Sequence, residues 1–178
     1  INMYDKLLKT LHSICIYSNI VYFIPGLYSL YSFKKYYKLM GILIILTGIC
    51  SVIHHSNEVA GISIKFWTYA DTSLAYIVTI IAFLTLIYLK LYKHRLSTPL
   101  VLTTGFLMTL SIIFYILSEI EYNTPGKGDP VQSWGSGIII EQFEDIKESE
   151  QVLYLTYHTI WHLLSGITGL LWVVTISQ

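Results

Sequence analysis

Apolar residues in this chain fall in long blocks, without the period of 2 or 3.6 residues that marks an element with one buried face. A membrane-spanning helix needs about 20 mainly apolar residues to cross a hydrocarbon layer of roughly 30 Å. Five segments qualify: 11–33, 39–56, 66–89, 99–118 and 151–177. The pattern therefore predicts an all-α fold, a polytopic bundle of five transmembrane helices, with residues 1–178 forming a single integral-membrane domain.

Two of these segments carry features that bear on helix ends and bends. The second segment is the shortest, and it reaches spanning length only when His54 and His55 are included. Pro25 lies inside the first segment, where we expect a kink because proline has no N–H to donate.

Charged residues are scarce, at 12% of the chain, compared with roughly 25% in an average soluble domain. The 11 Lys+Arg residues balance the 11 Asp+Glu residues, so the formal net charge is zero. No basic surface is expected that would hold phosphates, which excludes a nucleic-acid-binding protein. Cys15 and Cys50 both lie within predicted spans, where packed apolar thiols are expected rather than a disulfide.

Charges between the spans predict the orientation. The 34–38 and 90–95 turns hold six Lys and Arg residues and no acid, so the positive-inside rule assigns both turns to the cytoplasm. Ten of the 11 acids, including Glu58 and those of the 119–150 loop, fall on the other side, and the exception is Asp71. We expect a non-cytoplasmic N-terminus and a cytoplasmic C-terminus.

The acidic 119–150 loop is long enough to need an explanation of its own. Ile139, Phe143 and Ile146 stand at helical spacing among its acids, which indicates a short interfacial helix, with disorder as the alternative. The loop leads directly into the last span and is placed to act as a lid over that end of the bundle.

Five polar residues inside the spans are expected to converge in the outer half of the membrane. Ser51 and His55 are four residues apart near the outer end of the second helix, and Asp71 lies near the outer start of the third. His158 and His162 are also four residues apart, on the last helix. Residues at this spacing share a helix face, and ionisable groups within a span are costly enough to suggest a function.

This arrangement predicts a zinc site. His55, His158 and His162 can present three nitrogens to one Zn²⁺, which leaves a fourth position for a water whose pKa falls to about 7. Asp71 can take the proton of that water or orient a histidine, and Ser51 can hydrogen-bond the water or a developing oxyanion. Haem ligation by the two helix-sharing histidines, a proton relay, and simple packing of hydrogen-bonded histidines are the alternatives.

In order along the chain, Ser51-x-x-x-His55, then Asp71, then His158-x-x-x-His162 resemble the signature of the CREST superfamily of membrane hydrolases. This group includes alkaline ceramidases, GPI-remodelling proteins, and adiponectin and progestin receptors. The resemblance implies a zinc-dependent hydrolase that cuts an amide or ester bond of a lipid, with histidine ligands and with Asp71 and Ser51 around the activated water. The family core has seven spans, whereas the pattern here predicts five.

We therefore expect a ceramidase-like, zinc-dependent lipid hydrolase whose substrate, ceramide or a related acyl lipid, reaches the site sideways from the membrane. The main alternative is a non-enzymatic receptor or scaffold in which the metal is structural. A haem-binding electron carrier is the third possibility.

Thiol labelling tests the predicted orientation. Ser133→Cys, in the acidic loop, should react with an impermeant thiol reagent in sealed, right-side-out vesicles, whereas Ser32→Cys should react only after permeabilisation. The two positions are expected on opposite sides because the cationic turns hold one side in the cytoplasm. Labelling of Ser133→Cys only after permeabilisation would show that the topology is inverted.

Overall fold

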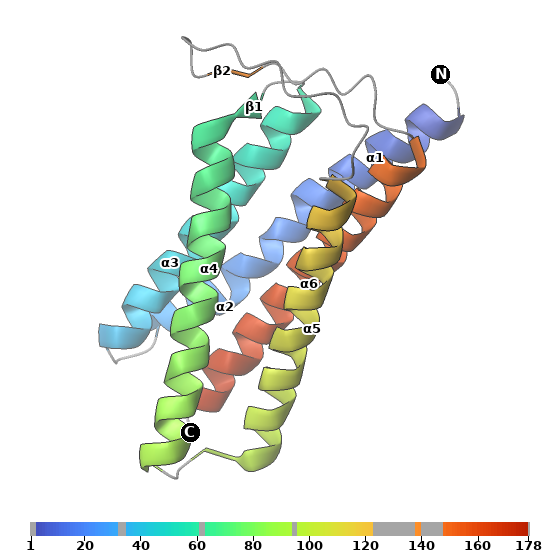
Figure 1. Ribbon diagram of the computed structural model, residues 1–178. Coiled ribbons are helices and arrows are strands. Elements are labelled where there is room, and N and C mark those ends of the chain that lie inside the picture. Colours follow the sequence, from blue (N-terminus) through green and yellow to red (C-terminus); the bar gives the residue numbers. More distant parts are fainter. Residues whose placement is uncertain are drawn as a thin grey trace.

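The computed structural model describes residues 3–31, 35–60, 63–93, 96–122, 138–139 and 148–177. Long helices run alongside one another over the length of the molecule, and the two chain ends lie at opposite ends of the bundle (Figure 1). The helical elements are α1 (Met3–Ser18), the 3-10 helix η1 (Asn19–Tyr22), α2 (Phe23–Tyr31), α3 (Lys35–Val59), α4 (Lys65–Tyr88), the π-helical turn η2 (Leu89–Lys93), α5 (Thr98–Tyr122) and α6 (Glu148–Ile176).

Five helical segments of the described chain are long and apolar enough to cross a membrane: Lys6–Tyr31, Lys35–Glu58, Phe66–Tyr92, Thr98–Glu121 and Gln151–Ile176. Large apolar side chains such as Ile80, Phe83, Leu102 and Phe106 are exposed on α4 and α5. Such a surface suits lipid rather than water. The predicted membrane bundle is confirmed, with five candidate spans among the described residues.

Both lysine-containing turns predicted between spans are partly helical in the structure. α3 begins at Lys35, and its first turn is held by Tyr37, whose hydroxyl donates to the carbonyl of Ile176 at 2.8 Å. Lys90 continues the helical path into η2, and its Nζ donates to the Leu96 carbonyl at 3.2 Å and to Thr98 Oγ1 at 2.7 Å. A long lysine side chain can extend its charge towards the membrane surface while its backbone stays in the helix.

The first span is interrupted where Pro25 was expected to kink it. The 3-10 helix η1 separates α1 from α2 and contains Val21, four residues before Pro25. The proline cannot donate to that carbonyl, so the regular α-helical ladder is broken there.

The predicted all-α fold is confirmed for the described residues, beside which there is one short strand pair. β1 (Ser63–Ile64) pairs antiparallel with β2 (Ile138–Ile139), in the register Ser63↔Ile139. Ile139 is therefore in a strand and not in the predicted interfacial helix, because pairing with the α3–α4 connection satisfies its backbone. The remaining residues of that predicted helix, Phe143 and Ile146, lie outside the described residues. β2 ties the acidic loop to the end of the bundle where α3 ends and α4 begins.

The apolar core lies towards the end of the bundle that holds the C-terminus. It is built from buried side chains of α3, α4, α5 and α6 and of the connection between α4 and α5: Tyr37, Met40, Ala82, Leu86, Leu96, Met108, Trp172, Val173 and Ile176. Trp172 is 1% exposed, and its Nε1 donates to the backbone carbonyl of Ala82 at 2.9 Å. This hydrogen bond holds α6 against α4. The buried polar side chains described below lie in the opposite half of the bundle.

Glycine permits the close approach of α2 and α3. A Cβ added at Gly41 would lie 2.6 Å from the Gly26 carbonyl oxygen and 2.9 Å from the Ser29 Cβ. These neighbours are backbone or backbone-linked atoms that cannot rotate away, so the two helices must separate if Gly41 is enlarged.

Gly41→Ala should therefore destabilise the bundle by about 1–3 kcal/mol, the usual cost of overpacking. Thermal unfolding of the purified protein in detergent measures this change. Gly105→Ala is the matched control, since a Cβ there meets nothing within 4 Å. Equal unfolding temperatures for the two variants would contradict the α2–α3 packing.

Candidate metal centre

The structure brings the five predicted site residues together in the half of the bundle away from the apolar core. Ser51 and His55 extend from α3, Asp71 from α4, and His158 and His162 from α6. All five are buried, and their exposed fractions range from 0% at His162 to 5% at His158. We call this set of five residues the polar centre.

Two histidines of the polar centre face each other through their Nε2 atoms. The distance from His55 Nε2 to His158 Nε2 is 3.1 Å. Two nitrogens bound to one tetrahedral zinc lie about 3.3 Å apart, given Zn–N bonds of about 2.0–2.1 Å. The His162 ring lies close to both, with centroid distances of 5.2 Å to His55 and 4.7 Å to His158.

The hydrogen bonds of His55 assign its lone pair to Nε2. Its Nδ1 lies 2.6 Å from Oε2 of Glu58, one turn further along α3. A carboxylate only accepts hydrogen bonds, so His55 Nδ1 carries the proton. A neutral His55 therefore presents an unprotonated Nε2 to His158.

The other two histidines are oriented in the same way by serines. Ser118 Oγ lies 3.3 Å from His158 Nδ1, and Ser18 Oγ lies 2.9 Å from His162 Nδ1. Each serine donates its own proton to a carbonyl of its helix, that of Tyr115 for Ser118 and that of Cys15 for Ser18. The serine oxygens therefore accept from Nδ1–H, which leaves an Nε2 lone pair on both histidines.

This hydrogen bonding fits a cation. Two unprotonated Nε2 atoms, of His55 and His158, cannot hydrogen-bond to each other at 3.1 Å, whereas a metal ion or a proton between them satisfies both. Histidine ligands held at their second nitrogen by a carboxylate or hydroxyl are typical of metal sites. The three histidines thus have the donor chemistry and tautomers that zinc requires.

Asp71 and Ser51 complete the polar centre. Ser51 Oγ donates to Asp71 Oδ2 at 3.2 Å and also lies 3.4 Å from His162 Nε2. Asp71 Oδ1 is buried and has no hydrogen-bond partner among the described residues. A buried carboxylate oxygen is costly to leave unpaired, and a water molecule beside it can donate the missing hydrogen bond.

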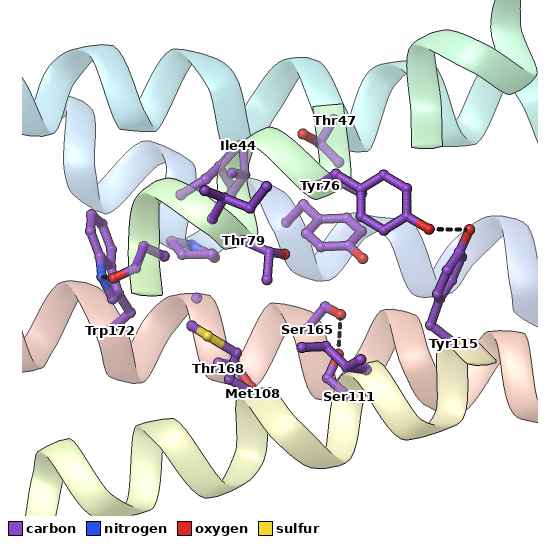
Figure 2. Close-up of a pocket in the computed structure, with 18 of the residues that line it drawn as sticks. Ile44, Thr47, Tyr76, Thr79, Met108, Ser111, Tyr115, Ser165, Thr168 and Trp172 are labelled. Atoms are coloured by element: carbon purple, nitrogen blue, oxygen red, sulfur yellow. Dashed lines mark hydrogen bonds between the residues drawn. The ribbon is translucent and has the colours of Figure 1, made fainter. Parts of the chain in front are cut away.

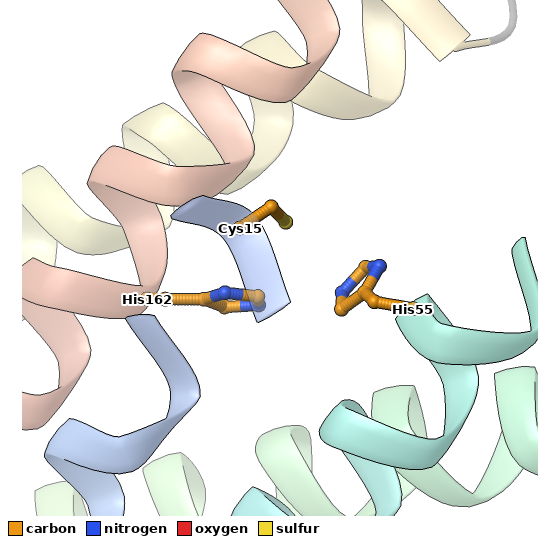
Figure 3. A group of neighbouring side chains, drawn as sticks. All are labelled: Cys15, His55 and His162. Carbon is orange, nitrogen blue, oxygen red and sulfur yellow. The ribbon is translucent and has the colours of Figure 1, made fainter. Parts of the chain in front are cut away.

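Ligand atoms of three residues lie within 4.8 Å of one another in two sets of the described residues. One set is His54, His55 and Glu58, and the other is Cys15, His55 and His162 (Figure 3). Both are buried groups able to bind a metal ion. The predicted trio of histidines is not one of these two sets, so its role as the ligand trio stays a prediction.

Four residues around the polar centre were missed by sequence reasoning. Glu58 was assigned to the outer acids, although its spacing of three from His55 places both on one helix face and gave a usable signal. His54 was given no role from the sequence, and its Nε2 lies 3.3 Å from Glu58 Oε1. Ser18 and Ser118 gave no signal, because serines within membrane helices usually bond only to their own backbone.

An apolar cavity of about 240 Å³ lies beside the polar centre, between α3, α4, α5 and α6 (Figure 2). Trp161 separates the two, since it lines the cavity and its ring centroid lies 4.8 Å from His158. Tyr115 packs on Trp161 at 4.8 Å and bonds to Tyr76 through hydroxyls 3.1 Å apart. An apolar space with polar groups at one end is the general form of a small-molecule site.

No protein-family model matches the chain, and no curated protein or solved structure matches it either. The functional interpretation therefore depends on the geometry of the polar centre and its neighbours.

Glu58 should raise the metal affinity of this centre by orienting His55. Glu58→Gln keeps the side-chain shape but removes the charge, so we expect the metal dissociation constant to rise about 10–100-fold. Competition with a chromophoric chelator measures this constant. Glu121→Gln, in α5, is the control and should keep the original affinity. If Glu58→Gln and Glu121→Gln had the same metal dissociation constant, Glu58 would have no role in metal binding.

Proposed function

We propose that the protein is an intramembrane zinc-dependent hydrolase that cleaves an amide or ester bond of a membrane lipid, with ceramide or a related acyl lipid as substrate. The observation that carries the proposal is the pair of Nε2 atoms of His55 and His158, 3.1 Å apart, each with its Nδ1 bonded elsewhere. His162, oriented in the same way by Ser18, supplies the third nitrogen.

Zinc, when bound, supplies Lewis acidity, which polarises a carbonyl and acidifies water at neutral pH. His55, His158 and His162 hold it. Asp71 is proposed as the general base, because its Oδ1 is unpartnered and can take a proton from water. Ser51, which donates to Asp71 Oδ2 at 3.2 Å, fixes the carboxylate so that Oδ1 faces the reacting water.

The proposed substrate class is supported by the cavity beside Trp161. An engineered cavity of about 150 Å³ takes up benzene, so this one, of about 240 Å³, has room for part of a longer hydrocarbon chain. Tyr76, Ile80 and Ile112 line it and are 51%, 57% and 43% exposed on α4 and α5. A lipid can therefore approach from the side, between these helices, with its polar linkage towards the histidines.

The proposed sidedness follows from the charge distribution. The cationic turns would lie in the cytoplasm, and the N-terminus and the polar centre would face the lumen or the exterior. The substrate would then come from the non-cytoplasmic leaflet.

One observation favours a second function, a receptor or scaffold with a structural metal. Cys15 Sγ lies within 4.8 Å of one nitrogen of His55 and one of His162, so it is a candidate fourth ligand, and four protein ligands are typical of structural zinc sites. The third possibility, a haem-binding electron carrier, is tested by a visible absorption spectrum of the purified protein, because haem absorbs visible light and zinc does not.

Asp71→Asn separates catalysis from metal binding. The variant should retain the bundle and the metal but lose lipid hydrolysis by about 10²-fold or more, because the general base is gone. Fatty-acid release from ceramide and other acyl lipids, and zinc content by elemental analysis, are measured on the same purified sample. Ser73→Ala, an exposed position two residues away, is the control and should be fully active.

Three results would contradict parts of this proposal. Loss of metal together with activity would make Asp71 a structural residue, and unchanged activity would remove it from the mechanism. A zinc-loaded wild-type protein that releases no fatty acid from any lipid tested would exclude the hydrolase and favour the structural metal site.

A further inference from the structure

The sequence assigned no function to the first span. In the structure, two side chains of α1, Cys15 and Ser18, lie next to histidines of the polar centre. Ser18 bonds to Nδ1 of His162, as described above. The carbonyl of Cys15 accepts both this serine hydroxyl, at 2.6 Å, and Nδ2 of Asn19, at 3.1 Å. These bonds fix the turn of α1 that carries the Cys15 thiol next to His162.

The Cys15 thiol is placed as a ligand. It is 1% exposed, and its sulfur lies within 4.8 Å of one nitrogen of His55 and one of His162. Figure 3 shows the thiol directed towards the space between these two rings. In a tetrahedral zinc site a sulfur and a nitrogen ligand are about 3.5 Å apart, so small side-chain adjustments bring the three donors onto one ion.

The other cysteine provides an internal comparison. Cys50 is on α3, next to Ser51, and is also buried and free. It belongs to neither of the two ligand sets found among the described residues. Burial alone therefore does not place a thiol at the metal centre.

We infer that Cys15 is a fourth protein ligand of the metal, which closes the centre at rest and has to leave before water can bind. His55 and His162 have nitrogens within 4.8 Å of the thiol, and His158 Nε2 lies 3.1 Å from that of His55. Together with Cys15 they would supply four donors, the number found in closed zinc sites, whereas catalytic sites keep one position for water. The inference rests on the proposed function for the presence of a metal and for the hydrolysis that closure would suppress.

The ligation step is a proton exchange and needs no oxidant. The S–H bond of Cys15 breaks, its electron pair forms the sulfur–metal bond, and the proton passes to the buffer. In the reverse step the sulfur–metal bond breaks, the thiolate takes up a proton, and water occupies the free position. Metal binding should thus release one proton fewer from a variant that lacks the thiol.

Cobalt(II) substitution of the full chain in detergent tests the inference, because a thiolate ligand gives cobalt a near-ultraviolet charge-transfer band that imidazole does not. The band should be present in the wild type and in Cys50→Ala. It should be lost in Cys15→Ala and in Cys15→Ser, which preserves the side-chain shape, while both variants keep the visible bands of bound cobalt. Zinc-loaded Cys15→Ala should hydrolyse lipid faster than the wild type.

The outcomes separate this inference from the proposed function. Bound cobalt without the band, or a band that persists in Cys15→Ala, would overturn the ligand assignment and leave the hydrolase intact. The band without hydrolysis in any variant would overturn the hydrolase and support Cys15 as a ligand. Slower hydrolysis by Cys15→Ala would overturn the closing role, and a wild type that binds no cobalt would overturn both proposals.

Discussion

Three buried imidazoles within an apolar bundle impose the constraint on which the rest of the structure depends, since a polar atom without a partner is costly where water is excluded. Each Nδ1 has its own partner: Glu58 on α3, Ser118 on α5 and Ser18 on α1. These hydrogen bonds position α1 and α5 against α6 and give all three histidines the same tautomer. The Nε2 atoms are thereby gathered on the inner side, where those of His55 and His158 face each other at 3.1 Å and a cation or a proton between them can satisfy both.

The contrast between the two halves of the bundle follows from the same constraint. Towards the C-terminal end, α4 and α6 pack through apolar side chains, and Trp172 bonds to the backbone of Ala82. At the other end, hydrogen bonds of His162 and His158 join α6 to α1 and α5. Trp161 lies at the boundary, with its ring 5.0 Å from His162 on one side and the apolar cavity on the other. A hydrocarbon chain in the cavity would therefore contact Trp161, the residue that packs against His158 and His162.

The sequence predicted the features that are local. Apolar blocks predicted the five spans, because a run of about 20 apolar residues has few other uses, and spacings of four placed Ser51 with His55 and His158 with His162 on shared faces. The sequence did not predict the partners that come from elsewhere in the chain. Cys15 resembles any packed thiol of a membrane helix until α6 is placed beside α1. Ile139 was misassigned for the same reason, since its strand exists only through pairing with Ser63.

Each of the five candidate spans among the described residues contributes side chains to the polar centre or to the hydrogen bonds that orient its histidines. Two helices, α3 and α6, carry the histidines, and α4 carries the carboxylate. The remaining two, α1 and α5, supply the serines that orient the imidazoles, so a chain lacking either would leave an Nδ1–H of a buried histidine without its acceptor. Hydrogen bonds between spans thus fix the positions of the His158 and His162 imidazoles. Cys15 of α1, which is not among the five residues of the resembled signature, lies within 4.8 Å of one nitrogen of His55 and one of His162.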